Sequence, residues 1–85
     1  MTVTARRIEK FEELDDTKMS YWADAAGTWW LYLPGCGLGN LANHQVEEHE
    51  DHTITVRPSI LVTGHDSGAK TVRHGYLTRG VWEDC

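Results

Sequence analysis

The sequence predicts a mainly β protein: one small domain, residues 1–85, with an antiparallel sheet of five or six short strands and at most one short helix. Two observations support this fold class. Short segments rich in β-branched and aromatic residues are separated by glycine, proline and polar breaks. In addition, 85 residues are too few for two domains, and we find no internal repeat.

The first 27 residues are ambiguous. Ile8, Phe11 and Leu14 recur at a three-residue step among good helix formers, which favours a short amphipathic helix over residues 5–14. A strand over residues 3–11 that ends at a polar break is the alternative. The segment that follows ends in an alanine- and glycine-containing connector, so residues 28–85 hold the clearer part of the domain.

Residues 28–33 predict a strand with apolar groups on both faces. Alternation places its side chains in two sets, Trp29, Leu31 and Leu33 against Thr28, Trp30 and Tyr32. Such a strand is either covered on both sides or offers one face to a partner. Pro34 ends the strand because proline cannot donate a ladder hydrogen bond. The glycines that follow permit a tight turn around Cys36.

The polar stretch 38–52 predicts a loop, with a short strand near residues 44–46 as an alternative. Residues 53–57 alternate and are rich in β-branched side chains, which predicts a strand with Ile54 and Val56 facing inward. Pro58 is expected to break this strand, and residues 60–63 to form another.

The C-terminal part predicts a β-hairpin. Residues 64–68 are rich in turn-forming residues and predict a loop. A strand follows over residues 71–77, and a tight turn at 78–80 leads into Val81 and Trp82.

Composition excludes several classes of function. Thirteen Asp and Glu against eight Lys and Arg give a net charge of −5, which argues against direct binding of nucleic acid. The same charge permits docking onto a basic partner in competition with nucleic acid. No apolar stretch is long enough to span a membrane or to serve as a signal peptide, so we expect a cytoplasmic location.

A zinc site is the sharpest chemical candidate. Its ligands would be Cys36, His74 and Cys85, with His44 or His65 as the fourth. Leu33 stands where a Cys-x-x-Cys knuckle would need its first cysteine. We therefore expect no cofactor, with one structural zinc as the alternative. The remaining interpretations are free thiols with surface histidines, or a disulfide between the two cysteines worth up to about 4 kcal/mol.

Other chemistry finds less support. A nucleophilic cysteine needs a neighbouring base in a cleft, and nothing in the sequence singles out such a pair. The glycines at 35, 37 and 39 are not followed by a helix that would bind phosphate. The histidines at 44, 49 and 52 lie among carboxylates and are typical of an acidic loop. The sequence therefore predicts a protein that is not an enzyme.

Aromatic residues are more numerous than one small core usually holds. Trp and Tyr are enriched where proteins bind one another. We therefore expect part of this set to form an interaction surface, for a protein partner or for self-association, with the candidates Trp22, Trp30, Tyr32, Tyr76 and Trp82.

Four segments resemble a family of small uncharacterised bacteriophage and prophage proteins. They are residues 29–37 (WWLYLPGCG), 53–64 (TITVRPSILVTG), 73–76 (RHGY) and 80–85 (GVWEDC). Family members carry W-W-x-x-C-P-G-C-G, S-P-S-I-L-V and a C-H-S-F hairpin, and have sometimes been labelled ammonia monooxygenase, for which this chain offers no support. The resemblance covers residues 28–85 and implies a small β-rich fold.

The chain departs from that pattern at two of the family's cysteines, which are Leu33 and Arg73 here. Either apolar packing and a hydrogen-bonded Arg73 replace a lost metal site, or loop histidines replace the thiols. The resemblance implies a location in the bacterial host cytoplasm or the virion. Our hypothesis is a non-enzymatic interaction module, either a small virion component or an inhibitor of a host defence protein. The alternative is a zinc-stabilised remnant of an enzyme or nucleic-acid-associated fold.

Overall fold

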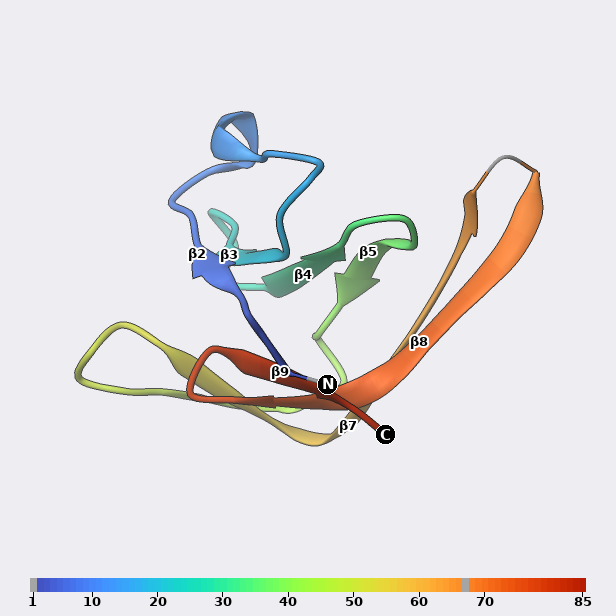
Figure 1. Ribbon diagram of the computed structural model, residues 1–85. Helices are drawn as coiled ribbons and strands as arrows, with labels where there is room; N and C mark the ends of the chain where they lie inside the picture. Colours follow the sequence, from blue (N-terminus) through green and yellow to red (C-terminus); the bar gives the residue numbers. More distant parts are fainter. Residues whose placement is uncertain (1, 67) are drawn as a thin grey trace.

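The computed structural model, which describes residues 2–66 and 68–85, consists of two β-sheets packed face to face (Figure 1). The five-stranded sheet has the order β1 (Thr2–Thr4), β9 (Val81–Asp84), β8 (Ala69–Thr78), β7 (Ile54–Asp66) and β6 (Gln45–Glu48). The four-stranded sheet has the order β2 (Arg6–Arg7), β3 (Ser20–Ala23), β4 (Trp29–Leu33) and β5 (Gly37–Asn40). Neighbouring strands are antiparallel except β2 and β3. The predicted mainly β class is confirmed.

The described residues form nine strands rather than five or six, because several short strands have little sequence signal of their own. β5 is glycine-rich, and β6 lies in the stretch expected to be a loop. Both nevertheless find a longer partner strand, β4 for the first and β7 for the second.

The N-terminal segment combines the two alternatives left open for residues 5–14. The chain passes from one sheet to the other at Ala5, whose N–H donates to the carbonyl of Gly80 at 2.8 Å. The next residue, Arg6, donates to the carbonyl of Met19 at 2.9 Å. Residues Phe11–Glu13 then form a single 3₁₀ turn, η1. The carboxylate of Glu13 accepts two backbone N–H groups that precede this turn and so fixes its start.

Pro58 does not divide residues 53–63 into two strands, contrary to the prediction. The Arg57–Pro58 peptide bond is cis, and the pairing of β7 with β8 shifts register between Val56 and Ile60. An irregularity of this kind accommodates a residue without an N–H, so one long strand replaces the two predicted short ones. The loop expected over 64–68 is also shorter, since β7 extends to Asp66 and β8 starts at Ala69. The predicted hairpin of β8 and β9 is confirmed.

The core lies between the two sheets. Leu31 and Leu33 of β4 are fully buried there, as the alternation predicts, and they pack in one cluster with Ile54, Leu77 and Trp82 of the other sheet. Gly64 permits the closest approach of the sheets, because an added Cβ would overlap the backbone carbonyl of Cys36. No helix of the described residues is long and apolar enough to cross a membrane.

Candidate interaction surface

The outer side of the four-stranded sheet carries an apolar, largely aromatic surface. We call it the aromatic face, and its members are Phe11, Trp22, Trp30, Tyr32 and Leu38. Strand register assembles it: Trp22 of β3 is opposite Trp30 of β4, and Tyr32 is opposite Leu38 of β5. These side chains point away from the core because their neighbours in β4, Leu31 and Leu33, point into it.

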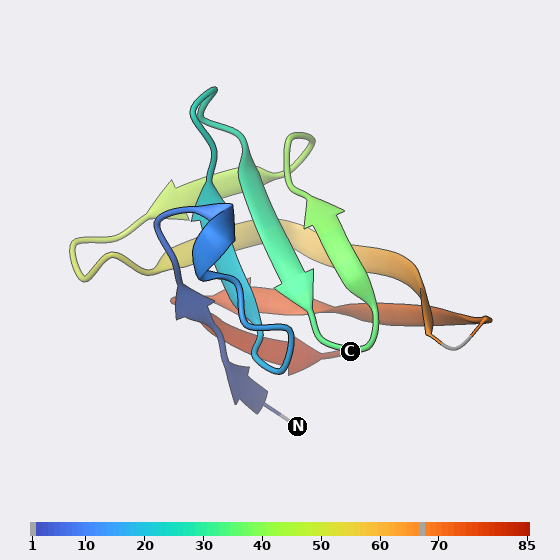
Figure 2. The ribbon, with the colours of Figure 1, turned by 90° about the horizontal axis from the view of Figure 1, so that it is seen from above.

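The N-terminal segment covers one half of this face. Figure 2 looks down on the four-stranded sheet and shows η1 lying over β3. The ring of Phe11 meets that of Trp22 edge to face, with centroids 6.0 Å apart. Trp22 is thereby reduced to 5% exposure, while Phe11 stays 56% exposed. The half formed by β4 and β5 is open, with Trp30 and Tyr32 half-buried and Leu38 exposed.

Asp24 holds the open half in place. Its carboxylate accepts the indole N–H of Trp30 at 3.0 Å and the backbone N–H groups of Ala26 and Thr28. These bonds, led by the one from Trp30, hold the pKa of Asp24 below its usual range, so the charge persists into mild acid. The hydroxyl of Tyr32 donates to the backbone carbonyl of Asp16 at 3.4 Å. The rings are therefore oriented before any partner arrives.

The surface around the aromatic face is acidic. Residues 9–24, which contribute η1 and β3, contain six carboxylates and two lysines. Arg6 of β2, which lies opposite Ser20 and donates to the carbonyl of Glu13, brings the net charge of this set to −3, against −5 for the whole chain. Beside Phe11 and Trp22 lies a shallow hollow of about 440 Å³ whose lining includes Glu9, Lys10 and Asp24. The aromatic face is thus suited to a cationic partner.

Comparisons with known proteins found no similar protein for this chain. Neither a model of a protein family, nor a curated protein, nor a solved structure matches the chain. The candidate site therefore rests on its own geometry and chemistry.

The five aromatic residues predicted to form an interaction surface do not share one. Trp30 and Tyr32 lie on the open half of the aromatic face, and Trp22 lies beneath Phe11. Tyr76 is 50% exposed but belongs to the outer side of the five-stranded sheet. Trp82 was wrongly placed on a surface: it is fully buried, because β9 directs it between the sheets.

The four predicted metal ligands are not brought together. Cys36 is buried, and its thiol donates to the carbonyl of Val62 at 3.2 Å. Cys85 is exposed, and its backbone N–H donates to the carbonyl of His74 on the five-stranded sheet. The Nε2 atoms of His44 and His74 contact the carbonyl and the hydroxyl of Ser59, at 3.1 and 2.8 Å. The side chain of His65 lies outside the described residues.

Within the described part of the chain, no three His, Cys, Asp or Glu side chains are arranged to hold a metal ion. Arg73 pairs with Asp84 and lies 5.9 Å from the ring centre of Trp82. Both cysteines are free thiols.

The sequence did not reveal two members of the aromatic face, Phe11 and Leu38, or Asp24, the residue that holds Trp30. The sequence pattern placed Phe11 on one side of a short helix with Ile8 and Leu14. Its aromatic ring could have marked it as a candidate for the interaction surface. Leu38 was hidden among glycines. Asp24 lies in a connector, and only the turn that ends at Gly27 brings its carboxylate to Trp30.

Proposed function

We propose that this protein is a non-enzymatic interaction module that binds a basic protein segment through its aromatic face. The observation that carries the proposal is the coincidence of exposed aromatic side chains with most of the net negative charge of the chain. A purely solvated acidic surface would have no need of Phe11 and Leu38 at 56% and 45% exposure.

The chemistry of this face selects cations. Lysine and arginine side chains gain from contact with the faces of Trp, Tyr and Phe, by about 0.5–1 kcal/mol at exposed sites and more where water is excluded. Their charged ends also gain from nearby carboxylates, which speed encounter and orient the partner. Because Trp30 is held by Asp24, little ordering of the site is needed on binding.

The resemblance to phage proteins supplies the biological setting of the proposal. In that setting the module is either a small virion component or an inhibitor of a host defence protein. Proteins that bind nucleic acid expose the basic segments that the aromatic face would recognise. An acidic module of this kind would compete with nucleic acid for the same surface.

The four tryptophan indoles provide a direct test by NMR. The probe is a synthetic arginine-rich peptide, and an acidic peptide of equal length is the control. We expect the basic peptide to shift the indole N–H resonance of Trp30 and to leave that of Trp82 unchanged, because Trp82 is fully buried. The Asp24→Asn variant loses the charge together with one of the two acceptor oxygens, either Oδ1 for Ala26 and Thr28 or Oδ2 for Trp30, and should bind more weakly.

Absence of a Trp30 shift with the basic peptide would refute the proposal. Equal shifts with the basic and acidic peptides would do the same, since they would show that charge plays no part in recognition. Adding salt provides a further check, because screening at about 0.5 M should weaken a charge-dependent contact markedly.

A further inference from the structure

The shallow hollow beside η1 combines aromatic, acidic and small side chains, and we call it the Phe11 hollow. It lies where η1 folds over β3 (Figure 2), and its volume is about 440 Å³. Its lining consists of Glu9, Lys10, Phe11, Trp22, Ala23, Asp24 and Ala25. Because the two alanines offer only methyl groups, the aromatic and charged side chains determine what the hollow can bind.

Phe11 provides the exposed aromatic surface of the hollow. Its ring meets that of Trp22 at an angle of 62°, with centroids 6.0 Å apart. Trp22 lies beneath and is nearly buried, so the ring that is open to a ligand is that of Phe11. An aromatic face attracts a cation through its quadrupole, and a planar guanidinium group can lie flat against it.

Two carboxylates of the lining remain able to accept further hydrogen bonds. Asp24 accepts three N–H groups, one of them the indole of Trp30, whereas an ionised carboxylate has about four lone-pair sites. Glu9 donates its backbone N–H to Glu13, but its own carboxylate belongs to neither ion pair of the described residues. The hollow can therefore receive the N–H groups of a bound cation.

The charge around the Phe11 hollow is negative on balance. Among the described residues that line it, Lys10 is the one cation, against Glu9 and Asp24. η1 adds two more carboxylates, and Arg6 donates to a backbone carbonyl of η1. Four carboxylates thus oppose two cations in this part of the surface, so a cationic ligand is favoured.

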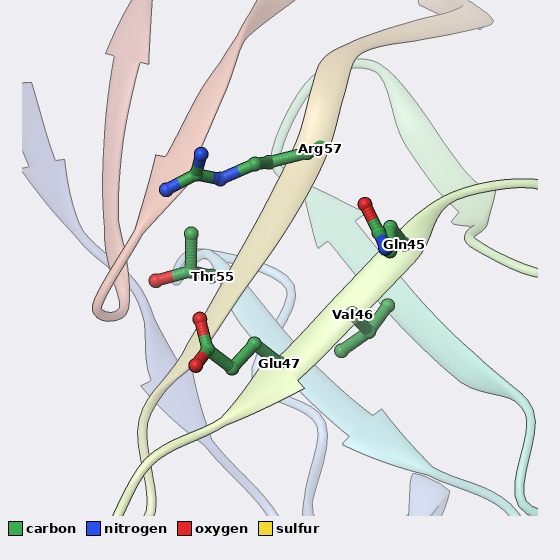
Figure 3. Close-up of a pocket in the computed structure, with 5 residues that line it drawn as sticks. All are labelled: Gln45, Val46, Glu47, Thr55 and Arg57. Carbon is green, nitrogen blue, oxygen red and sulfur yellow. The ribbon is translucent and has the colours of Figure 1, made fainter.

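The hollow between β6 and β7 lacks this combination. The described residues of its lining include one charge of each sign, Glu47 and Arg57, and no aromatic side chain. Figure 3 shows both charged side chains extending over the same side of the sheet, with Thr55 between them. A hollow of that kind favours neither sign of charge, in contrast to the Phe11 hollow.

We propose that the Phe11 hollow binds one arginine side chain of the partner, with its guanidinium against the ring of Phe11 and its N–H groups directed to Glu9 and Asp24. Arginine suits the hollow better than lysine, because a guanidinium is planar and weakly hydrated, whereas an ammonium is compact and strongly hydrated. This binding mode rests on the proposed function, and it adds the identity and the position of the residue by which the partner is anchored.

Three short peptides test the ligand. Each carries one central residue in an otherwise uncharged sequence, which is arginine, lysine or citrulline, the uncharged analogue of arginine. In NMR titrations we expect the arginine peptide to shift the indole N–H resonance of Trp22 and to leave that of the fully buried Trp82 unchanged. The lysine peptide should bind about two- to fivefold more weakly, and the citrulline peptide should cause no shift.

Variants of the lining test the position of the arginine. Glu9→Gln should weaken binding of the arginine peptide about two- to fivefold, as expected for an exposed charge pair. Phe11→Leu keeps apolar bulk over Trp22 but removes the aromatic face, and it should weaken binding by a similar factor. Lys10→Gln should strengthen binding, because it removes a like charge from the lining. All three positions are exposed and lie outside the core, and circular dichroism establishes that each variant is folded.

The matched controls are Glu83→Gln and Lys70→Gln, which make the same changes of charge on the outer side of the five-stranded sheet and should resemble wild type. If each control changed binding as much as its counterpart in the lining, net charge alone would explain recognition and the proposed site would be wrong. Equal binding of the arginine and lysine peptides would also overturn the proposal, as would a shift of Trp22 by the citrulline peptide.

Two indole resonances separate this site from the proposed function. With the arginine-rich peptide, a shift of Trp30 without a shift of Trp22 would retain the proposed function and reject the Phe11 hollow as the anchor. A shift of Trp22 without a shift of Trp30 would retain the arginine site and reject the proposed function as stated.

Discussion

Gly75 is a position at which even the smallest side chain should lower the stability of the fold markedly. Gly75 lies on β8 opposite Ile60 on one side and Asp84 on the other. A Cβ placed there would overlap the carbonyl of Glu83 and come within 2.7 Å of Cζ2 of Trp82. Carbon atoms in contact are normally about 3.5–4.0 Å apart, so the Trp82 ring or the strand must move by about 1 Å.

The expected cost follows from how firmly Trp82 is held. Its ring is fully buried, and its indole N–H donates to Asp84 at 2.9 Å. Overpacking a tight core costs about 1–3 kcal/mol, and we expect Gly75→Ala to lie near the upper value. For a domain of this size each kcal/mol lowers Tm by roughly 4–8 °C, so the shift should be roughly 12–24 °C.

Thermal and urea unfolding followed by circular dichroism will measure this loss. Gly27→Ala is the matched control, because Gly27 has φ of 85° but nothing within 4 Å of an added Cβ. It should lose only about 1 kcal/mol, through backbone conformation alone. Adding Trp82→Phe to Gly75→Ala relieves the overlap with the indole ring but leaves the overlap with the carbonyl of Glu83, so the two changes should cost somewhat less together than their sum.

Equal losses for Gly75→Ala and Gly27→Ala would refute the reasoning. They would mean that the overlap with Trp82 has no energetic consequence and that the loss at Gly75 comes only from the change in backbone freedom. Additive losses in the double variant would show that the cost of Gly75→Ala comes from the overlap with the Glu83 carbonyl and not from Trp82.

Three further predictions concern the thiols, Asp84 and Trp30. In the native protein a thiol reagent should modify the exposed Cys85 at once, and Cys36 only on unfolding because Cys36 is buried. Rapid modification of both cysteines would contradict the burial of Cys36. The indole N–H of Trp82, followed by Arg73, holds the pKa of Asp84 below its usual value near 4. The ionised carboxylate of Asp84 therefore contributes stability above pH about 4, and this contribution is lost as the pH falls through the lowered pKa. Below pH 4 the free energy of unfolding should fall more steeply in wild type than in Asp84→Asn. Parallel pH curves for the two proteins would contradict this prediction. Trp30→Ala should lower the free energy of unfolding by only about 1–2 kcal/mol, whereas Trp82→Ala should lower it by about 3–5 kcal/mol. Trp30→Ala should also abolish the peptide-induced changes on the aromatic face. Losses of equal size for the two variants in urea titrations would place Trp30 in the core.

Features determined by local sequence were predictable. The alternation of residues 28–33 identifies β4 and the two sets of side chains on its two sides, and the turn before Val81 identifies the C-terminal hairpin. Pro58 misled the prediction because the irregularity that accommodates it depends on β8, which is distant in sequence. β5 was missed because its glycines serve a long-range purpose: a Cβ on Gly39 would lie 2.9 Å from Val62.

The candidate site was harder to predict than the fold. Alternation states that two residues share a side of a strand, but it does not state which side faces the second sheet. Trp30 and Trp82 both lie on alternating strands, yet one is half-exposed and the other fully buried. The covering of Trp22 depends on where η1 folds back, and nothing local to Trp22 encodes that contact.

The pairing of β1 with β9 constrains how the chain can be synthesised and folded. Thr2 is opposite Glu83, so the five-stranded sheet joins segments some eighty residues apart. While the chain is still on the ribosome, β1 has no partner until residues 81–84 have emerged, and Ala5 lacks the carbonyl of Gly80 that accepts its N–H. Such long-range pairing gives a high contact order, which slows folding to the millisecond-to-second range typical of all-β domains. During that interval the aromatic side chains of the unfinished fold are exposed to any molecule they meet.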